Sequence, residues 1–251
     1  MRFDPKHPIK SSKAAISATF GSLYYLERLM KVDASDTHYL DFLLGLQESL
    51  DETTLGQNHF EFLLNDSNFK SLCDEYWMPP YPDLEKLSNL PKGSLGWVYA
   101  HNLLDEGFTP DKILSLDPYP VNSVKEYTIH RIWQTHDFIH ALLGFEVNEV
   151  GEIGVLAYTF ANMHSPMCQA MFTGALMTYA AGKSSDYKKT HSLPDMCHAV
   201  SIGLGLGIKA PPLLGFKLEE MLEVPIIEWR KKLNLPASVD GSLPFMREDK
   251  F

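Results

Sequence analysis

The apolar residues of this chain recur mainly at the three- and four-residue spacing of amphipathic helices. The alternating, β-branched runs that indicate strands are scarce. The pattern predicts a helix that follows a turn at Leu90 and runs through Leu104, and further helices over 12–31, 38–50, 58–64, 122–143, 150–164, 167–181, 194–208 and 218–233. We therefore expect an all-α fold, in the form of a compact multi-helix domain.

Proline-rich stretches mark the breaks between these helices. Met78-Pro-Pro-Tyr-Pro ends the N-terminal third, Asp117-Pro-Tyr-Pro interrupts the middle, and Pro225 is expected to kink or interrupt the last helix. The polar stretch Lys183–Lys189 is expected to form a loop. None of these stretches is long enough for a domain linker, and no internal repeat is found, so we expect residues 1–251 to form a single helical domain.

Composition and charge restrict the partners of such a domain. Hydrophobic residues make up 45% of the 251 residues, and the net charge is −10. A surface this acidic repels phosphate backbones, which argues against general nucleic-acid binding. Cys73, Cys168 and Cys197 lack CxxC spacing, so we expect a reducing compartment. No signal peptide or transmembrane segment is predicted, so the expected location is cytoplasmic or peripheral at a membrane.

The segment His136-Asp-Phe-Ile-His140 places ionisable side chains on an apolar helix face. The two histidines are four residues apart and share one stripe with aliphatic residues, whereas Arg131 falls away from that stripe. Asp137 lies at the edge of the stripe. On the next helix, Glu152 begins a second apolar stripe. A turn at the intervening glycine would let the two helices run antiparallel and bring Glu152 back toward the histidines.

Two histidines, an aspartate and a glutamate aimed at an interior are costly unless they are paired or bind a metal. A divalent cation would satisfy all four, so we expect a metal site made of His136, Asp137, His140 and Glu152 between the two helices. This set of nitrogen and oxygen ligands suits zinc first, then manganese, iron or cobalt, and magnesium less well.

Each of these residues has a plainer interpretation when taken alone. A single inward histidine is usually a hydrogen-bonded core residue, and Glu152 alone could be a helix-start acid favoured by the helix dipole. Asp137 is one methylene shorter than the glutamate of the HExxH pattern, which disfavours peptidase chemistry, and it either ligates the metal or orients a histidine. The combination of all four is more specific than any part of it.

The spacing His-Asp-x-x-His, eleven residues, then Glu resembles the signature of the coenzyme Q biosynthesis proteins of the Coq-four type. Weaker flanking similarities extend the resemblance over roughly 90–235, with the N-terminal helices of 1–80 expected to pack on that core. The residues that carry these flanking similarities are Leu90–Gly96, Tyr99, Pro110-Asp111, Arg131, Gly144, Gly151, Ser165–Met167, Glu228–Arg230 and Leu233–Leu235. The chain departs from the family pattern at Trp133, Leu156 and Thr159, where basic or acidic residues are common.

The resemblance implies a mostly helical fold, a divalent metal at the signature and a role in ubiquinone biosynthesis. It further implies prenylated quinone precursors as ligands, removal of the ring carboxylate at C1, and association with other quinone-biosynthesis proteins at a membrane. On this basis Ile132, Leu143, Val155 and Leu156 are expected to line a channel for the isoprenoid tail, although plain core packing explains each of them equally well. The small residues of 167–181 suit close helix packing, within one chain or in the homodimer that we expect.

Two other functions remain open from the sequence. The first is a non-enzymatic scaffold that binds a prenyl lipid. The second is a metal-dependent phosphohydrolase, which would need further ligands such as His101 with Asp105, or His191 with Asp195.

Overall fold

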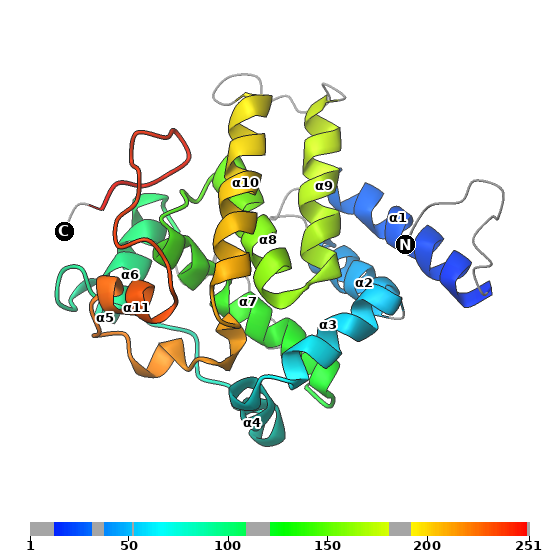
Figure 1. Ribbon diagram of the computed structural model, residues 1–251, viewed down its shortest axis with the longest axis horizontal. Coiled ribbons are helices and arrows are strands. Elements are labelled where there is room, and N and C mark those ends of the chain that lie inside the picture. Colours follow the sequence, from blue (N-terminus) through cyan, green and yellow to red (C-terminus); the bar gives the residue numbers. More distant parts are fainter. Residues whose placement is uncertain (1–12, 32–37, 52, 109–120, 181–191, 250–251) are drawn as a thin grey trace.

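The computed structural model describes residues 13–31, 38–51, 53–108, 121–180 and 192–249. Within these ranges the chain contains helices and no strand, and the all-α prediction is confirmed. The α-helices, labelled in Figure 1, are α1 (Lys13–Leu29), α2 (Tyr39–Asp51), α3 (Thr54–Leu64), α4 (Ser67–Glu75), α5 (Leu84–Ser88), α6 (Leu95–Asp105), α7 (Val124–Leu143), α8 (Glu149–Met163), α9 (Pro166–Ala180), α10 (Leu193–Lys209) and α11 (Ile226–Lys232).

The helices differ from the sequence prediction at a few places. The periodicity does not predict α4 and α5, which are short and begin at capping carboxylates of Asp66 and Asp83. The helix over 218–233 is interrupted at Pro225 as predicted, and α11 begins after that proline. The predicted break at Asp117 and the predicted loop Lys183–Lys189 lie outside the described residues.

Helix α8 lies at the centre of the molecule, with α10 packed along it and α9 beside it (Figure 1). Glycines allow the close approach of α8 and α10. A Cβ atom at Gly203 would lie 2.2 Å from the carbonyl oxygen of Gly154, and one at Gly207 would lie 2.6 Å from that of Tyr158. Backbone atoms cannot withdraw as a flexible side chain can, so the packing of α8 depends on these glycines.

The N-terminal helices pack on the same part of the molecule from another side. Leu29 of α1 and Leu43 and Leu46 of α2 form a small apolar cluster with Met167 and Cys168 of α9. Trp133 of α7 and Leu156 of α8 contact this cluster. The N-terminal helices therefore lie against the faces of α7 and α8 from which the expected metal ligands come.

Helix α7 is buried more completely than its apolar stripe predicts. Arg131, which falls outside the stripe, is fully buried. Its guanidinium pairs with Glu219 at 2.6 Å, hydrogen-bonds Gln134 at 3.0 Å and lies 5.0 Å from the ring centroid of Trp77. A buried arginine is tolerated when it is paired in this way, so the polar side of α7 is also covered by protein.

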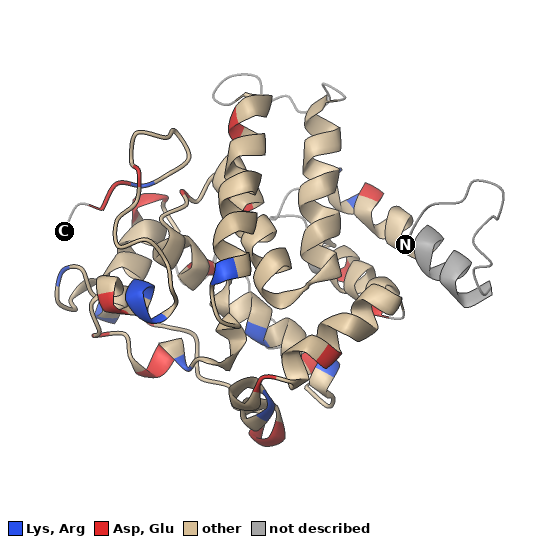
Figure 2. Cartoon of the chain, in the orientation of Figure 1, with Lys and Arg blue, Asp and Glu red and all other residues tan. Residues whose placement is uncertain are grey.

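Charged residues are sparse on the central helices. Helix α9 has none, and those of α8 are Glu149 and Glu152 in its first turn (Figure 2). No helix in the described part of the chain combines the length and the apolarity that crossing a membrane requires.

We predict that Gly203→Ala lowers the free energy of unfolding by about 1–3 kcal/mol, because the new methyl group meets the α8 backbone. Gly205→Ala is the matched control on the same helix, since beyond its chain neighbours and the adjacent backbone of its own helix no atom lies within 4 Å of its Cβ position. Better helix propensity should leave that variant neutral or stabilised by up to about 1 kcal/mol. Urea unfolding measures both, and equal stabilities would contradict the proposed packing.

Candidate metal centre

Helix α7 carries both histidines of the candidate centre. Ser123 caps its start, with a hydroxyl that accepts a hydrogen bond from the Glu126 N–H, and Gly144 caps its end with a left-handed φ of 76°. His136 and His140 lie one turn apart, with ring centroids separated by 5.1 Å. The His140 side chain is 1% exposed and that of His136 is 29% exposed. The second histidine therefore lies in the core and the first at its border.

The turn between α7 and α8 positions the carboxylate of Glu152. Asn148 caps α8 by accepting a hydrogen bond from the Gly151 N–H at 2.9 Å. Gly151 suits this turn because a Cβ atom there would lie 1.9 Å from the carbonyl oxygen of Glu146. Glu152 follows in the first turn of α8, where the helix dipole favours a negative charge.

Glu152 faces both histidines. One carboxylate oxygen, Oε2, lies 3.0 Å from His136 Nε2, and the other, Oε1, lies 3.1 Å from His140 Nε2. One ligand atom from each of the three residues falls within 4.8 Å of the others. A donor set of this kind at this spacing could hold one divalent cation.

The hydrogen bonding of His140 fits a metal ligand. Its Nδ1 lies 3.2 Å from the carbonyl oxygen of Phe145 and must donate, because a carbonyl only accepts. In the neutral ring, Nε2 then carries a lone pair toward Glu152. Although Nε2 is 3.1 Å from a carboxylate oxygen, it is buried and makes no hydrogen bond of suitable geometry. A backbone carbonyl that fixes the tautomer is the usual support of a metal-bound histidine.

The charges of this group are strongly coupled. Burial lowers the pKa of His136, but the charge of Glu152 and the hydrogen bond to it outweigh burial and raise that pKa to about 9. Burial raises the pKa of Glu152, yet His140 and His136 together hold it far below the usual value. At neutral pH His136 thus holds a proton that a cation would have to displace.

Asp137, the fourth predicted ligand, is not part of the group whose ligand atoms lie within 4.8 Å of one another. It lines the adjoining cavity together with His136 and Glu152. Burial raises the pKa of Asp137, and the attraction of His136 and His140 only partly offsets that effect. Asp137 thus lines the cavity beside His136 and Glu152, and its role as a ligand or as a residue that orients a histidine stays a prediction.

A cavity of about 370 Å³ adjoins the centre. Its wall is largely aromatic and apolar and includes Ile132 and Leu156, two of the four residues that we expect from the sequence along a tail channel. Leu143 and Val155 pack instead in the main core. Val155 does not line the cavity because successive side chains on a helix point about 100° apart, so it points away from its neighbour Leu156. Leu143 does not line it either, and this residue lies one turn beyond His140. The aromatic residues of the wall are Tyr39, Tyr81, Tyr99, Phe108 and Trp133.

Sequence reasoning assigns none of the three tyrosines to the cavity, and two of them interact with its charged groups. Tyr39 comes from α2, and burial together with the charge of Glu152 raises its pKa to about 12. Tyr99 comes from α6, and burial, then the charge of Asp137, raises its pKa as well. Both reach the cavity through packing between distant segments, which no local spacing encodes.

The other candidate ligands do not gather. His101 Nδ1 lies 2.9 Å from the carbonyl oxygen of Trp97, and Asp105 pairs with Arg247. Asp195 caps α10, while His191 lies outside the described residues. Among the residues described, His136, His140 and Glu152 form the one close set of three such side chains.

Comparison with known proteins gives mitochondrial ubiquinone biosynthesis proteins as relatives. The chain is 32% identical over 158 residues to COQ4 of Pyricularia oryzae, a match that covers 63% of this chain and 49% of the relative. It is 28% identical over 240 residues to coq4 of Talaromyces marneffei, covering 94% of this chain and 76% of the relative. The chain spans about half the length of most of the curated relatives it matches.

The fold matches a crystal structure of a Nostoc punctiforme protein that is provisionally named a ubiquinone biosynthesis protein. The TM-score is 0.69 at 23% identity, over 86% of this chain and 97% of that one. The family model for the coenzyme Q (ubiquinone) biosynthesis protein Coq4 matches residues 80–238, which include the candidate centre. This chain belongs to the Coq4 family.

Proposed function

We propose that this protein acts in ubiquinone biosynthesis by holding a divalent cation and a prenylated aromatic precursor side by side. One observation carries the proposal: the set of His136, His140 and Glu152 borders a cavity lined with aromatic and aliphatic side chains. Membership of the Coq4 family, and the names of the fungal relatives, favour a quinone precursor as the occupant.

The three ligands would hold the cation. Two imidazoles and one carboxylate favour zinc, with manganese, iron or cobalt as alternatives and magnesium less suitable. When bound, such an ion supplies Lewis-acid chemistry toward a ring carboxylate or oxygen. The protein contributes the orientation of His140 through Phe145 and the negative charge of Glu152, which balances the ion.

The apolar wall would hold the rest of the precursor. The aromatic side chains offer stacking faces for a ring, and Ile132, Leu156 and Met171 offer aliphatic surface for an isoprenoid tail. Trp133, Leu156 and Thr159, which differ from the common family residues, all belong to this wall. These three differences from the common family residues therefore remove charged side chains from the cavity wall, and they leave the three ligands unchanged.

Asp137 is the residue we assign to proton transfer. Loss of a ring carboxylate as carbon dioxide leaves an electron pair on the ring carbon, which must take up a proton. The Asp137 carboxyl lines the cavity, and burial raises its pKa above the usual value, so it is suited to hold that proton. Decarboxylation at the ring is the reaction that these groups support.

A non-enzymatic lipid-binding scaffold would use the same cavity without turnover. A phosphohydrolase has less support, because such enzymes need further metal ligands, and the described residues contain no second group of three candidate ligands. Turnover assays separate the first two functions.

We predict that His140→Ala weakens zinc binding by about 100-fold or more, since a ligand with a fixed tautomer is lost. Elemental analysis of purified protein and competition with a chelator measure the effect. His101→Ala is the control, because that histidine lies outside the candidate centre and hydrogen-bonds the Trp97 carbonyl. Unchanged zinc content in His140→Ala would refute the assigned centre.

Cation binding should release protons. At pH 7.5, below the His136 pKa of about 9, zinc binding should displace about one proton from His136, and affinity should rise about tenfold per pH unit up to that pKa. Calorimetry in buffers of different ionisation enthalpy counts the protons. His136→Gln should lose this release, and a variant that released as many protons as the wild type would contradict the assignment.

Leu156→Gln should weaken binding of a prenylated hydroxybenzoate about tenfold or more, because it places an amide in the apolar wall, and should leave zinc content unchanged. Ile208→Gln is the control, since Ile208 is 75% exposed on α10.

Release of labelled carbon dioxide from the ring carboxylate should occur with the wild type and fall in Asp137→Asn. Tight binding without any release would support the scaffold function instead.

A further inference from the structure

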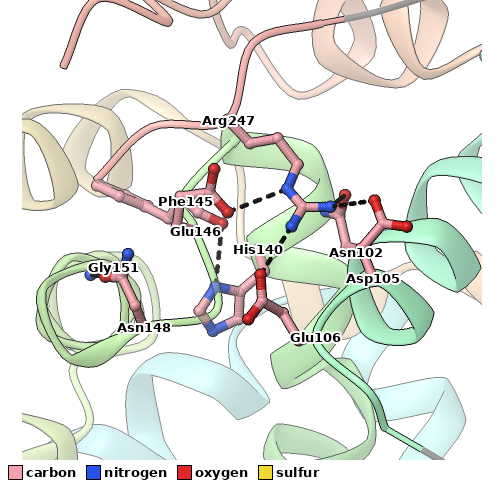
Figure 3. Close-up of polar contacts among 9 residues, drawn as sticks. All are labelled: Asn102, Asp105, Glu106, His140, Phe145, Glu146, Asn148, Gly151 and Arg247. Atoms are coloured by element: carbon pink, nitrogen blue, oxygen red, sulfur yellow. Dashed lines mark hydrogen bonds and ion pairs between the residues drawn. The ribbon is translucent and has the colours of Figure 1, made fainter. Parts of the chain in front are cut away.

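The last described segment of the chain, residues 239–249, runs back over the turn between α7 and α8. We call this segment the C-terminal strap. It follows α11 and lies beyond residues 80–238, which the family model matches. Figure 3 shows Arg247 of the strap beside Phe145 and Glu146 of the turn, with His140 next to them.

Backbone hydrogen bonds join the strap to the turn on both sides of Phe145. The Glu146 N–H donates to the Phe245 carbonyl at 3.0 Å, and the Arg247 N–H donates to the Gly144 carbonyl at 2.7 Å. The residue held between these two bonds is Phe145, whose own carbonyl accepts the hydrogen bond from His140 Nδ1. The strap thus fixes the peptide that orients this imidazole.

The Arg247 side chain adds a polar clamp. Its guanidinium donates to Glu146 at 3.0 Å, to Asn102 at 3.2 Å, to Asp105 at 3.1 Å and to Glu106 at 3.1 Å (Figure 3). Glu146 belongs to the turn, whereas the other three partners belong to the end of α6. One side chain that is 20% exposed therefore ties strap, turn and α6 together.

Two buried contacts anchor the strap at either side of Arg247. Phe245 is fully buried and stacks with Phe145 at a ring separation of 6.4 Å. Asp249 pairs with buried Arg230 at 3.0 Å, and Arg230 in turn donates to the Leu142 carbonyl at the end of α7 at 2.9 Å. These anchors act on the last turn of the helix that carries the histidines.

We infer that the C-terminal strap is a positioning element of the metal centre, with Arg247 as its main positioning residue. By holding the turn Gly144–Asn148, the strap sets the ring orientation of His140 and the distance of Glu152 from it. The part that concerns the cation rests on the proposed function, whereas the part that concerns the His140 ring does not.

Arg247→Gln in the full chain tests the inference, with Glu248→Gln as the control that removes an exposed neighbouring charge. We expect Arg247→Gln to weaken Co²⁺ binding by about 10–100-fold, as loss of a supporting contact behind a ligand does. The control should bind Co²⁺ like the wild type. Arg247→Lys should recover only part of the loss, because one ammonium cannot reproduce the forked contacts.

A second readout separates positioning from stability and needs no metal. In nitrogen-15 histidine spectra, the His140 Nδ1 proton should exchange with water faster in Arg247→Gln than in the wild type, at temperatures where both are folded. A chain ending at Leu243 should show the same change more strongly if it folds. Wild-type Co²⁺ affinity and unchanged proton exchange in Arg247→Gln would overturn the inference. Absence of Co²⁺ binding by the wild type would refute the metal centre, and the proton exchange would still decide the role of the strap.

Discussion

Helix α7 buries ionisable side chains on more than one face. Much of the surrounding structure supplies the hydrogen-bond and ion-pair partners that these buried groups require. Arg131 on one side requires the carboxylate of Glu219, and His140 on another side requires the carbonyl of Phe145. His136, nearer the surface, pairs with Glu152. Each of these groups would be costly inside the protein without its partner. The helix is therefore held in place by polar contacts as well as by apolar packing.

The partners of α7 come from segments far apart in the sequence. Glu219 comes from the turn before α11, Glu152 from α8, and the Arg230 guanidinium that caps the end of α7 from α11 itself. Close packing of α10 on α8, through Gly203 against the Gly154 carbonyl, also holds the helix that carries Glu152. Catalytic and binding groups need such support, because small displacements of a ligand weaken a site that depends on geometry.

Local patterns account for what could be predicted from the sequence. The four-residue spacing of His136 and His140, and the glycine turn before Glu152, describe contacts between residues close in the chain, and these three side chains do gather. Arg131 falls outside the apolar stripe, and its burial depends on a partner 88 residues away. Tyr39 and Tyr99 reach the cavity by long-range packing in the same way. Spacing alone also could not decide that Asp137, at the edge of the stripe, lies in the cavity wall.

The charge of the cavity wall bears on how the proposed ligands would bind. Among the described residues that line it, there is no lysine or arginine, while Asp137 and Glu152 are both acidic. The remaining ionisable member of opposite charge is His136, whose proton would leave when a cation binds. A precursor with a ring carboxylate would then meet positive charge only at the cation itself, since the aromatic and aliphatic wall offers none. Binding of the cation and of an anionic ring would therefore be thermodynamically coupled, and each would strengthen the other by the same factor.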